Sequence, residues 1–121
     1  MLDGGQPDKP AITVLSAAAG PVERAVLAGI EEEGVPCVLT RCPDGTDRDA
    51  AALAREAARL STLDVGVGID QHSHVHIGHE LLTEAMPELA SPGPATAGFA
   101  RLAGHNAARI VVGIPLRISP A

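Results

Sequence analysis

Three consecutive carboxylates, Glu31–Glu33, have the residue types and spacing that say most about chemistry in this sequence. They follow an apolar helical stripe and precede Gly34, where the helix is expected to end. A helix C-terminus carries partial negative charge, so exposed acids there cost about 0.3–1 kcal/mol each. The ordinary interpretation of such a run is a solvated charged face. The alternative is a contribution to a Mg²⁺ site, because Mg²⁺ takes one or two carboxylates with waters and phosphate oxygens. By helical angle, Glu33 lies nearest the apolar stripe, Glu31 opposite it and Glu32 on its flank.

A cluster of imidazoles, His72, His74, His76 and His79, offers a second kind of chemistry. A strand over 72–77 would place the first three on one face, where they could ligate zinc or nickel. We favour a polar strand face that is rich in histidine, because only Glu80 adds a carboxylate at a usual ligand spacing.

The segment that starts at Asp70 also begins like the D-x-H-x-x-G pattern by which some cobalamin domains present histidine to cobalt. Val75 stands where that pattern requires glycine, and no matching glycine pair follows. Cobalamin ligation through His72 is therefore not expected.

Nucleotide binding and catalysis find little support in the turn from Ser16 to Pro21. The turn lacks both glycine-rich patterns whose backbone amides cradle phosphate. Ser16 could be paired with a histidine, but no nucleophile-elbow pattern is present. We expect this chain alone to be non-catalytic.

A polar residue, Asn106, lies on the apolar stripe of the last predicted helix. A buried amide must find hydrogen-bond partners, and neighbouring loop backbone is favoured over an intersubunit contact. Arg109 lies on a different face, and we expect it to make a salt bridge or an intersubunit contact. The rest of the stripe is Phe99, Leu102, Ala103 and Ile110.

Composition narrows the class of protein. The formal net charge of −6 and the single aromatic residue, Phe99, argue against nucleic acid as a partner. Cys37 and Cys42 lie five residues apart on an extended segment, so their side chains should point to opposite faces and form no disulfide. The polar N-terminus and the absence of an apolar run of about 20 residues indicate a cytosolic chain.

Hydrophobic periodicity predicts strands that alternate with helices. Residues 1–10 read as a disordered arm and 11–121 as a single domain. The predicted strands are 11–15, 37–40, 65–69 and 74–77, and the predicted helices are 21–33, 48–60 and 96–112. Thr46 or Asp47 should cap the second helix, and Gly66 and Gly68 should let a helix approach closely. Residues 78–94 are ambiguous, and 114–117 could pair as a sheet edge. Such alternation gives right-handed crossovers, hence a small three-layer Rossmann-like α/β domain with a mainly parallel sheet of about four strands.

Several segments together resemble the small (beta) subunit of the reactivating factor for adenosylcobalamin-dependent diol and glycerol dehydratases. The matching segments, in the order expected for that family, are Pro10–Val14, Leu27–Pro36, Gly68–His72, Asn106–Arg109 and Gly113–Pro115. Residues 73–100, with the histidine-rich run, depart from the family pattern.

This resemblance implies a fold similar to the dehydratase medium subunit without its cobalamin pocket. It implies a chaperone-like, non-catalytic protein that forms a heterotetramer of two large ATPase subunits and two small subunits. ATP-driven subunit exchange with the dehydratase would then release damaged cobalamin. In the family the middle glutamate of the Glu-Glu-Glu-Gly run completes a Mg²⁺ site that belongs mostly to the large subunit, and here that residue is Glu32.

The resemblance further implies that this chain alone binds neither cobalamin nor ATP. It implies a cytoplasmic location and leaves open whether a bacterial microcompartment encloses the system, and whether propanediol or glycerol is the substrate. Two other hypotheses remain: a corrinoid- or nucleotide-binding α/β module, and a His-rich metal-binding protein.

Overall fold

Strands and helices alternate in the computed structural model, which describes residues 10–43, 45–80 and 90–113. The elements are β1 (Ile12–Ser16), α1 (Pro21–Glu32), β2 (Cys37–Arg41), α2 (Ala50–Leu60), β3 (Val65–Ile69), β4 (Val75–His79) and α3 (Ala97–Val112). The predicted order of elements is confirmed. The predicted arm, apart from residue 10, the tail 114–117 and residues 81–89 of the ambiguous stretch lie outside the described residues.

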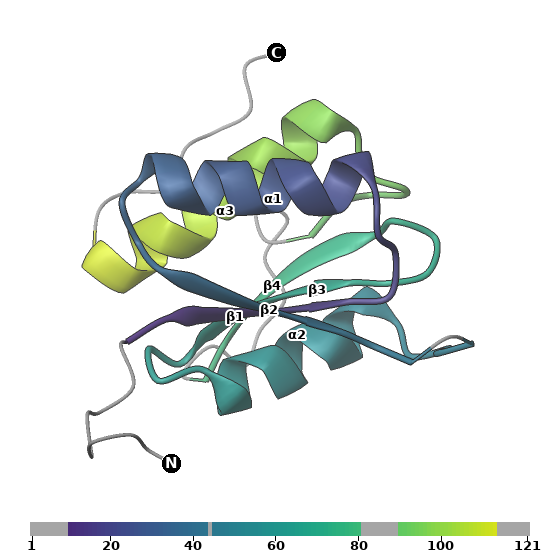
Figure 1. The fold of residues 1–121 in the computed structure, drawn as a ribbon, viewed down its shortest axis with the longest axis horizontal. Helices are drawn as coiled ribbons and strands as arrows, with labels where there is room; N and C mark the ends of the chain where they lie inside the picture. The colour runs from purple at the N-terminus through teal and green to yellow at the C-terminus, as the bar shows by residue number, and fades with distance from the viewer. Residues whose placement is uncertain (1–9, 44, 81–89, 114–121) are drawn as a thin grey trace.

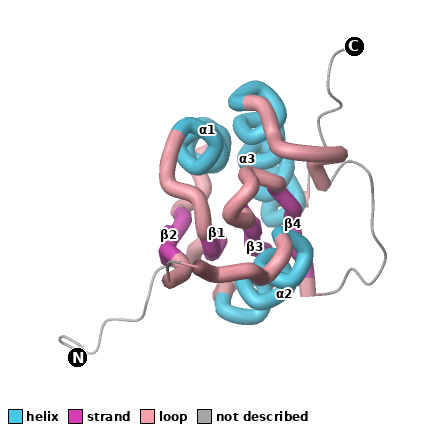
Figure 2. The backbone as a smooth tube through the Cα atoms, turned by 90° about the vertical axis from the view of Figure 1, so that its right-hand side faces the viewer, coloured by secondary structure: helices cyan, strands magenta, loops and turns pink. Residues whose placement is uncertain are grey.

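The four strands form one sheet in the order β2-β1-β3-β4. β1 pairs in parallel with both β2 and β3, whereas β4 returns antiparallel to β3. α1 and α3 lie on one face of the sheet and α2 on the other (Figure 1). The view turned by 90° shows the same three layers, with α1 beside α3 (Figure 2). The predicted three-layer, mainly parallel architecture is therefore confirmed.

The core is aliphatic and thin where α2 meets the sheet. β1 and β3 are buried along their whole length, as expected of central strands covered by helices. A Cβ atom added at Gly66 would lie 2.4 Å from the backbone of Ala57, and one added at Gly68 would lie 2.3 Å from that of Ala50. Both neighbours belong to α2, so the predicted close approach of a helix to these glycines is confirmed.

Side chains and glycines fix where the helices begin and end. Asp49, and neither Thr46 nor Asp47, caps α2: its carboxylate accepts the Ala52 N–H at 2.7 Å. The cap must directly precede the first helical residue, and α2 begins two residues later than predicted. Thr96 caps α3 in the same way, and Gly113 ends that helix in the left-handed conformation.

Within residues 10–43, 45–80 and 90–113, no helix is long and apolar enough to cross a membrane.

Candidate functional site

The crossing of α1 and α3 brings together residues that lie far apart in the sequence. A Cβ atom at Gly29 would lie 2.1 Å from the Arg101 carbonyl oxygen, and one at Gly104 would lie 2.2 Å from the Val26 carbonyl oxygen. The two helix backbones therefore touch at these glycines, where no other residue would fit. This contact places the C-terminal end of α1 against the middle of α3.

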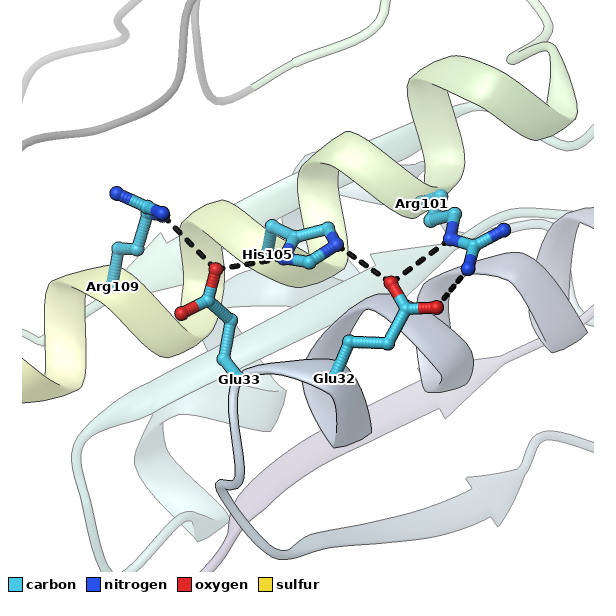
Figure 3. A network of polar contacts seen from close by, with 5 residues as sticks. All are labelled: Glu32, Glu33, Arg101, His105 and Arg109. Atoms are coloured by element: carbon cyan, nitrogen blue, oxygen red, sulfur yellow. Dashed lines mark hydrogen bonds and ion pairs between the residues drawn. The ribbon is translucent and has the colours of Figure 1, made fainter.

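Two acids at the C-terminal end of α1, its last residue Glu32 and the capping residue Glu33, meet three basic residues of α3 beside this crossing (Figure 3). Arg101, His105 and Arg109 follow one another at four-residue spacing and so share one face of α3. One Glu33 oxygen, Oε2, lies 2.7 Å from Nδ1 of His105 and 3.0 Å from Nε of Arg109. One Glu32 oxygen, Oε1, lies 2.7 Å from Nε2 of His105 and 2.9 Å from Nε of Arg101. We call these five residues the acid–base ladder.

Arg101 binds both oxygens of Glu32, because its terminal nitrogen contacts Oε2 while its Nε contacts Oε1. Such a two-pronged guanidinium–carboxylate contact fixes geometry as well as charge. The Arg101 side chain is nevertheless 57% exposed, whereas that of His105 is 13% exposed. The outer contact of Glu32 is therefore with a solvated side chain and the inner contact with a buried one.

His105 has a carboxylate oxygen facing each ring nitrogen. Ionised carboxylates can only accept hydrogen bonds, so each of these contacts is a hydrogen bond where the facing ring nitrogen carries a proton. The hydrogen bond from His105 lowers the pKa of Glu33; burial opposes this shift, and the hydrogen bond and charge of Arg109 add to it. The guanidinium groups of Arg101 and Arg109 thus lie against the two carboxylates, one at each end of the ladder.

The acid run is thus not simply a solvated face at the wrong end of a helix dipole. The prediction that Glu33 lies nearest the apolar stripe is confirmed: its side chain is 15% exposed, that of Glu32 is 37% exposed, and Glu31 is also exposed. The basic residues of α3 lie across from the acids and compensate their charge. The salt bridge predicted for Arg109 is also confirmed.

Sequence reasoning missed Arg101 and His105 as partners of the acids. Their four-residue spacing with Arg109 marked a basic stripe on α3. The pairing itself follows from the way two helices cross, and no periodicity within either helix reports that.

A doubly wound domain holds its ligand at the carboxyl ends of neighbouring strands. In this chain, the carboxyl ends of β1 and β3 are held together by a backbone hydrogen bond. The backbone N–H of Ala17 donates to the Ile69 carbonyl at 2.8 Å, which keeps the two strand ends together. Glu23, in the first turn of α1, is only 2% exposed and binds Arg41 through both oxygens, at 3.2 and 2.7 Å. The hydrogen bonds from Arg41 lower the pKa of Glu23 against the opposing effect of burial. A fixed negative charge therefore lies where a phosphate would use the helix N-terminus.

The alternative strand over 72–77, which would place His72, His74 and His76 on one face, is wrong, whereas the strand predicted over 74–77 corresponds to β4 (Val75–His79). One oxygen of Asp70 accepts the backbone N–H groups of His72 and His74, each at 2.9 Å, and the other lies 2.8 Å from Nδ1 of His74. These bonds fold the chain into a turn, so β4 begins only at Val75. The resemblance of this segment to a cobalamin pattern therefore corresponds to a turn held by a carboxylate.

Burial raises the pKa of Asp70, but the hydrogen bonds from the His74 backbone and side chain outweigh it, so the pKa is lowered overall. Burial lowers the pKa of His76 in β4, and nearby Arg55 acts in the same direction. In the described part of the chain, no three His, Cys, Asp or Glu side chains form a group that could hold a metal ion.

Three remaining sequence candidates are placed by the structure. Asn106 is buried, as predicted, at 1% exposure. Ser16 is buried at the end of β1, and its hydroxyl lies 3.3 Å from the Ala18 nitrogen. Cys37 packs with the α1/α3 side of the core and Cys42 with Leu15 on the α2 side, so the two thiols lie on opposite faces as predicted.

Comparison with known proteins shows similarity over nearly the whole chain. A family model described as the dehydratase medium subunit matches residues 9–117. The propanediol dehydratase-reactivating factor small subunit of Salmonella typhimurium is 40% identical over 106 residues, which cover 88% of this chain and 87% of that protein. The diol dehydratase-reactivating factor small subunit of Klebsiella michiganensis is 39% identical over 107 residues, 88% of this chain and 82% of that protein.

Solved structures agree with these relatives. A glycerol dehydratase reactivase chain superposes with a TM-score of 0.78 at 30% identity and covers 91% of this chain and 98% of that one. A chain of a diol dehydratase-reactivating factor complexed with ADP and Mg²⁺ superposes with a TM-score of 0.75 at 35% identity and covers 92% of this chain and 100% of that one.

Proposed function

Since the chain belongs to the dehydratase medium subunit family, and within it to the small subunits of diol and glycerol dehydratase-reactivating factors, we propose that it is the exchangeable, non-catalytic subunit of such a factor. The observation that carries this proposal is the extent of the likeness. It spans 88% of the chain and 87% of the Salmonella typhimurium relative, so it involves the whole domain and not one shared segment.

The proposed partner is a large ATPase subunit, with two copies of each subunit in the complex. In this scheme ATP drives the small subunit off the large one, the medium subunit of the dehydratase takes its place, and damaged cobalamin leaves the opened dehydratase. The family model supports the exchange, because it describes the dehydratase medium subunit while the individual relatives are reactivating factors. Two proteins of one fold can compete for one docking surface.

We further propose that Glu32 lends a carboxylate oxygen to a Mg²⁺ site held mostly by the large subunit. The donor set of this chain fits such a shared site, because a hard oxygen ligand suits Mg²⁺ and one or two protein carboxylates suffice. The described residues offer no group of three ligands that would bind a metal alone. A structural neighbour is a reactivating factor complexed with ADP and Mg²⁺. Within a complex, Mg²⁺ would bridge the two subunits' ligands electrostatically.

Co-expression with the large ATPase subunit of a diol or glycerol dehydratase-reactivating factor tests the proposal. An affinity tag on the large subunit should retain this chain in equal amount, and purified dehydratase added with ATP should release it. A corrinoid- or nucleotide-binding module would not co-purify in this way. The proposal fails if the two chains elute separately from a gel-filtration column at micromolar concentration.

A further inference from the structure

Glu32, the carboxylate proposed for the shared cation site, already makes hydrogen bonds with basic side chains of its own chain. Arg101 binds both oxygens of Glu32, and His105 binds one of them from the other side. A carboxylate offers about four lone-pair positions, and these contacts take three of them. A Mg²⁺ ion binds oxygen ligands and keeps several of its waters. A guanidinium offers it no oxygen ligand.

The two partners of Glu32 differ in their freedom to move. His105 is 13% exposed and is fixed at its other nitrogen by Glu33, which Arg109 also holds. Arg101 is 57% exposed, and its carboxylate contact is confined to Glu32 in the ladder. Departure of Arg101 would leave Glu32 still bound to His105 through Oε1 and would uncover Oε2, which contacts Arg101 (Figure 3).

We propose that Arg101 is an internal counter-ion that covers Glu32 in the free chain and is displaced when Glu32 joins the divalent cation of the large subunit, while His105 is the positioning residue that keeps the carboxylate in place. This inference rests on the function proposed above and concerns how that site is regulated. Arg101 and the cation compete for the same carboxylate, because Arg101 contacts both of its oxygens and His105 contacts one. Because Arg101 must be displaced from Glu32, the two subunits should separate readily below a certain concentration of the divalent cation.

Substitutions at the two partners should have opposite effects. Removal of Arg101 removes the competitor, so less Mg²⁺ should suffice for assembly. Removal of His105 frees the carboxylate to rotate, so more should be needed. A substitution that merely loosened the fold would weaken assembly in both cases.

The experiment measures the dissociation constant of the complex between this chain and the full-length large subunit across a MgCl₂ titration. Arg101→Gln should lower the half-maximal Mg²⁺ concentration about two- to fivefold, the factor expected from one exposed ion pair. His105→Ala should raise it. Arg101→Gln should have no effect in a Glu32→Gln background, because nothing is left to uncover. Arg59→Gln is the matched control, since Arg59 makes a similar exposed two-nitrogen contact with Glu56 on α2.

Circular dichroism of each free variant verifies that the fold is unchanged. The inference is overturned if Arg101→Gln weakens assembly or leaves its Mg²⁺ dependence unchanged, if His105→Ala shifts it in the same direction as Arg101→Gln, or if the effect of Arg101→Gln survives in the Glu32→Gln background. If the wild-type chain forms no complex at any Mg²⁺ concentration, the proposed function itself has failed.

Discussion

Glu31 and Glu32 are neighbours with different surroundings, and this difference gives a sharp test of the proposed metal ligand. Glu31 is exposed, whereas Glu32 is held by Arg101 and His105. Glu32→Gln should weaken the complex with the large subunit and its Mg²⁺ dependence, while Glu31→Gln should leave both nearly unchanged. If a binding titration showed comparable losses of affinity for the two variants, the acid run would contribute only surface charge and Glu32 would not be the metal ligand.

The stability of the free chain should respond little to Glu32→Gln. Its partner Arg101 is largely exposed, and ion pairs of that kind contribute about 0–1 kcal/mol. A chain that lost its fold on this substitution would contradict the assignment of Glu32 to an exposed edge of the ladder.

Glu33 should make stability depend on pH. Its pKa is lowered in the folded chain, chiefly by the hydrogen bond from His105, so its stabilising effect is complete above the ordinary glutamate pKa of about 4.3 and is lost as pH falls through the lower folded value. Glu33→Gln should therefore lower the Tm at pH 7, and the gap to wild type should close below about pH 4. Thermal melts followed by circular dichroism measure this gap, and a gap that persists undiminished at pH 3 would contradict the prediction.

At the scale of elements, the contact of α1 with α3 depends on the two glycines at the crossing. Gly104→Ala would place a Cβ atom 2.2 Å from the Val26 carbonyl oxygen, so the helices must separate. We expect a net loss of about 1–3 kcal/mol, because overpacking outweighs the gain in helix propensity. Urea unfolding followed by circular dichroism measures the loss.

Gly98→Ala is the control for this substitution. Gly98 lies in the first turn of the same helix, and its nearest neighbour to an added Cβ is Thr96 Oγ1 at 3.9 Å. The variant should gain about 0.5–1 kcal/mol from the removal of a helical glycine. Equal stabilisation of both variants would mean that the crossing is not closely packed.

Most of the fold could be predicted from the sequence, because each element has a strong local pattern. The apolar runs indicated the order of strands and helices along the sequence. The glycine pair of β3 indicated the close approach of α2. The capping residue of α2 could not be chosen, because Thr46, Asp47 and Asp49 are all good caps and only the true start of the helix distinguishes them.

The site could be predicted only in part. The greater burial of Glu33 follows from helical angle at the end of α1, and it was predicted correctly. Their partners Arg101 and His105 belong to another helix, so the pairing depends on a tertiary crossing. The strand at 74–77 was predicted correctly and is β4, but its conditional extension to 72 was wrong, because the Asp70 side chain binds the backbone N–H groups of His72 and His74. The role of Glu32 as a metal ligand stays a prediction.

At the scale of the whole molecule, the chain carries the dehydratase medium subunit fold, and the buried Glu23, paired with Arg41, places a negative charge in the first turn of α1. We therefore expect no micromolar binding of ATP or adenosylcobalamin by the isolated chain. Isothermal titration calorimetry of the purified chain measures this for each ligand. Saturable binding of either one would favour a ligand-binding module over the exchangeable subunit.

The ladder between α1 and α3 also bears on how the helices find their alignment. Because its basic residues repeat every four positions, a slide of α3 by four residues, about 6 Å, would still leave some acids facing basic side chains. The ion pairs alone would therefore allow several alignments of α3 along α1. The same slide would bring Ala100 or Ala108 to the place of Gly104, opposite Gly29, where a methyl group does not fit. The alignment of the two helices is therefore determined by steric exclusion at Gly104, which lacks a Cβ atom. The ion pairs add stability to that alignment.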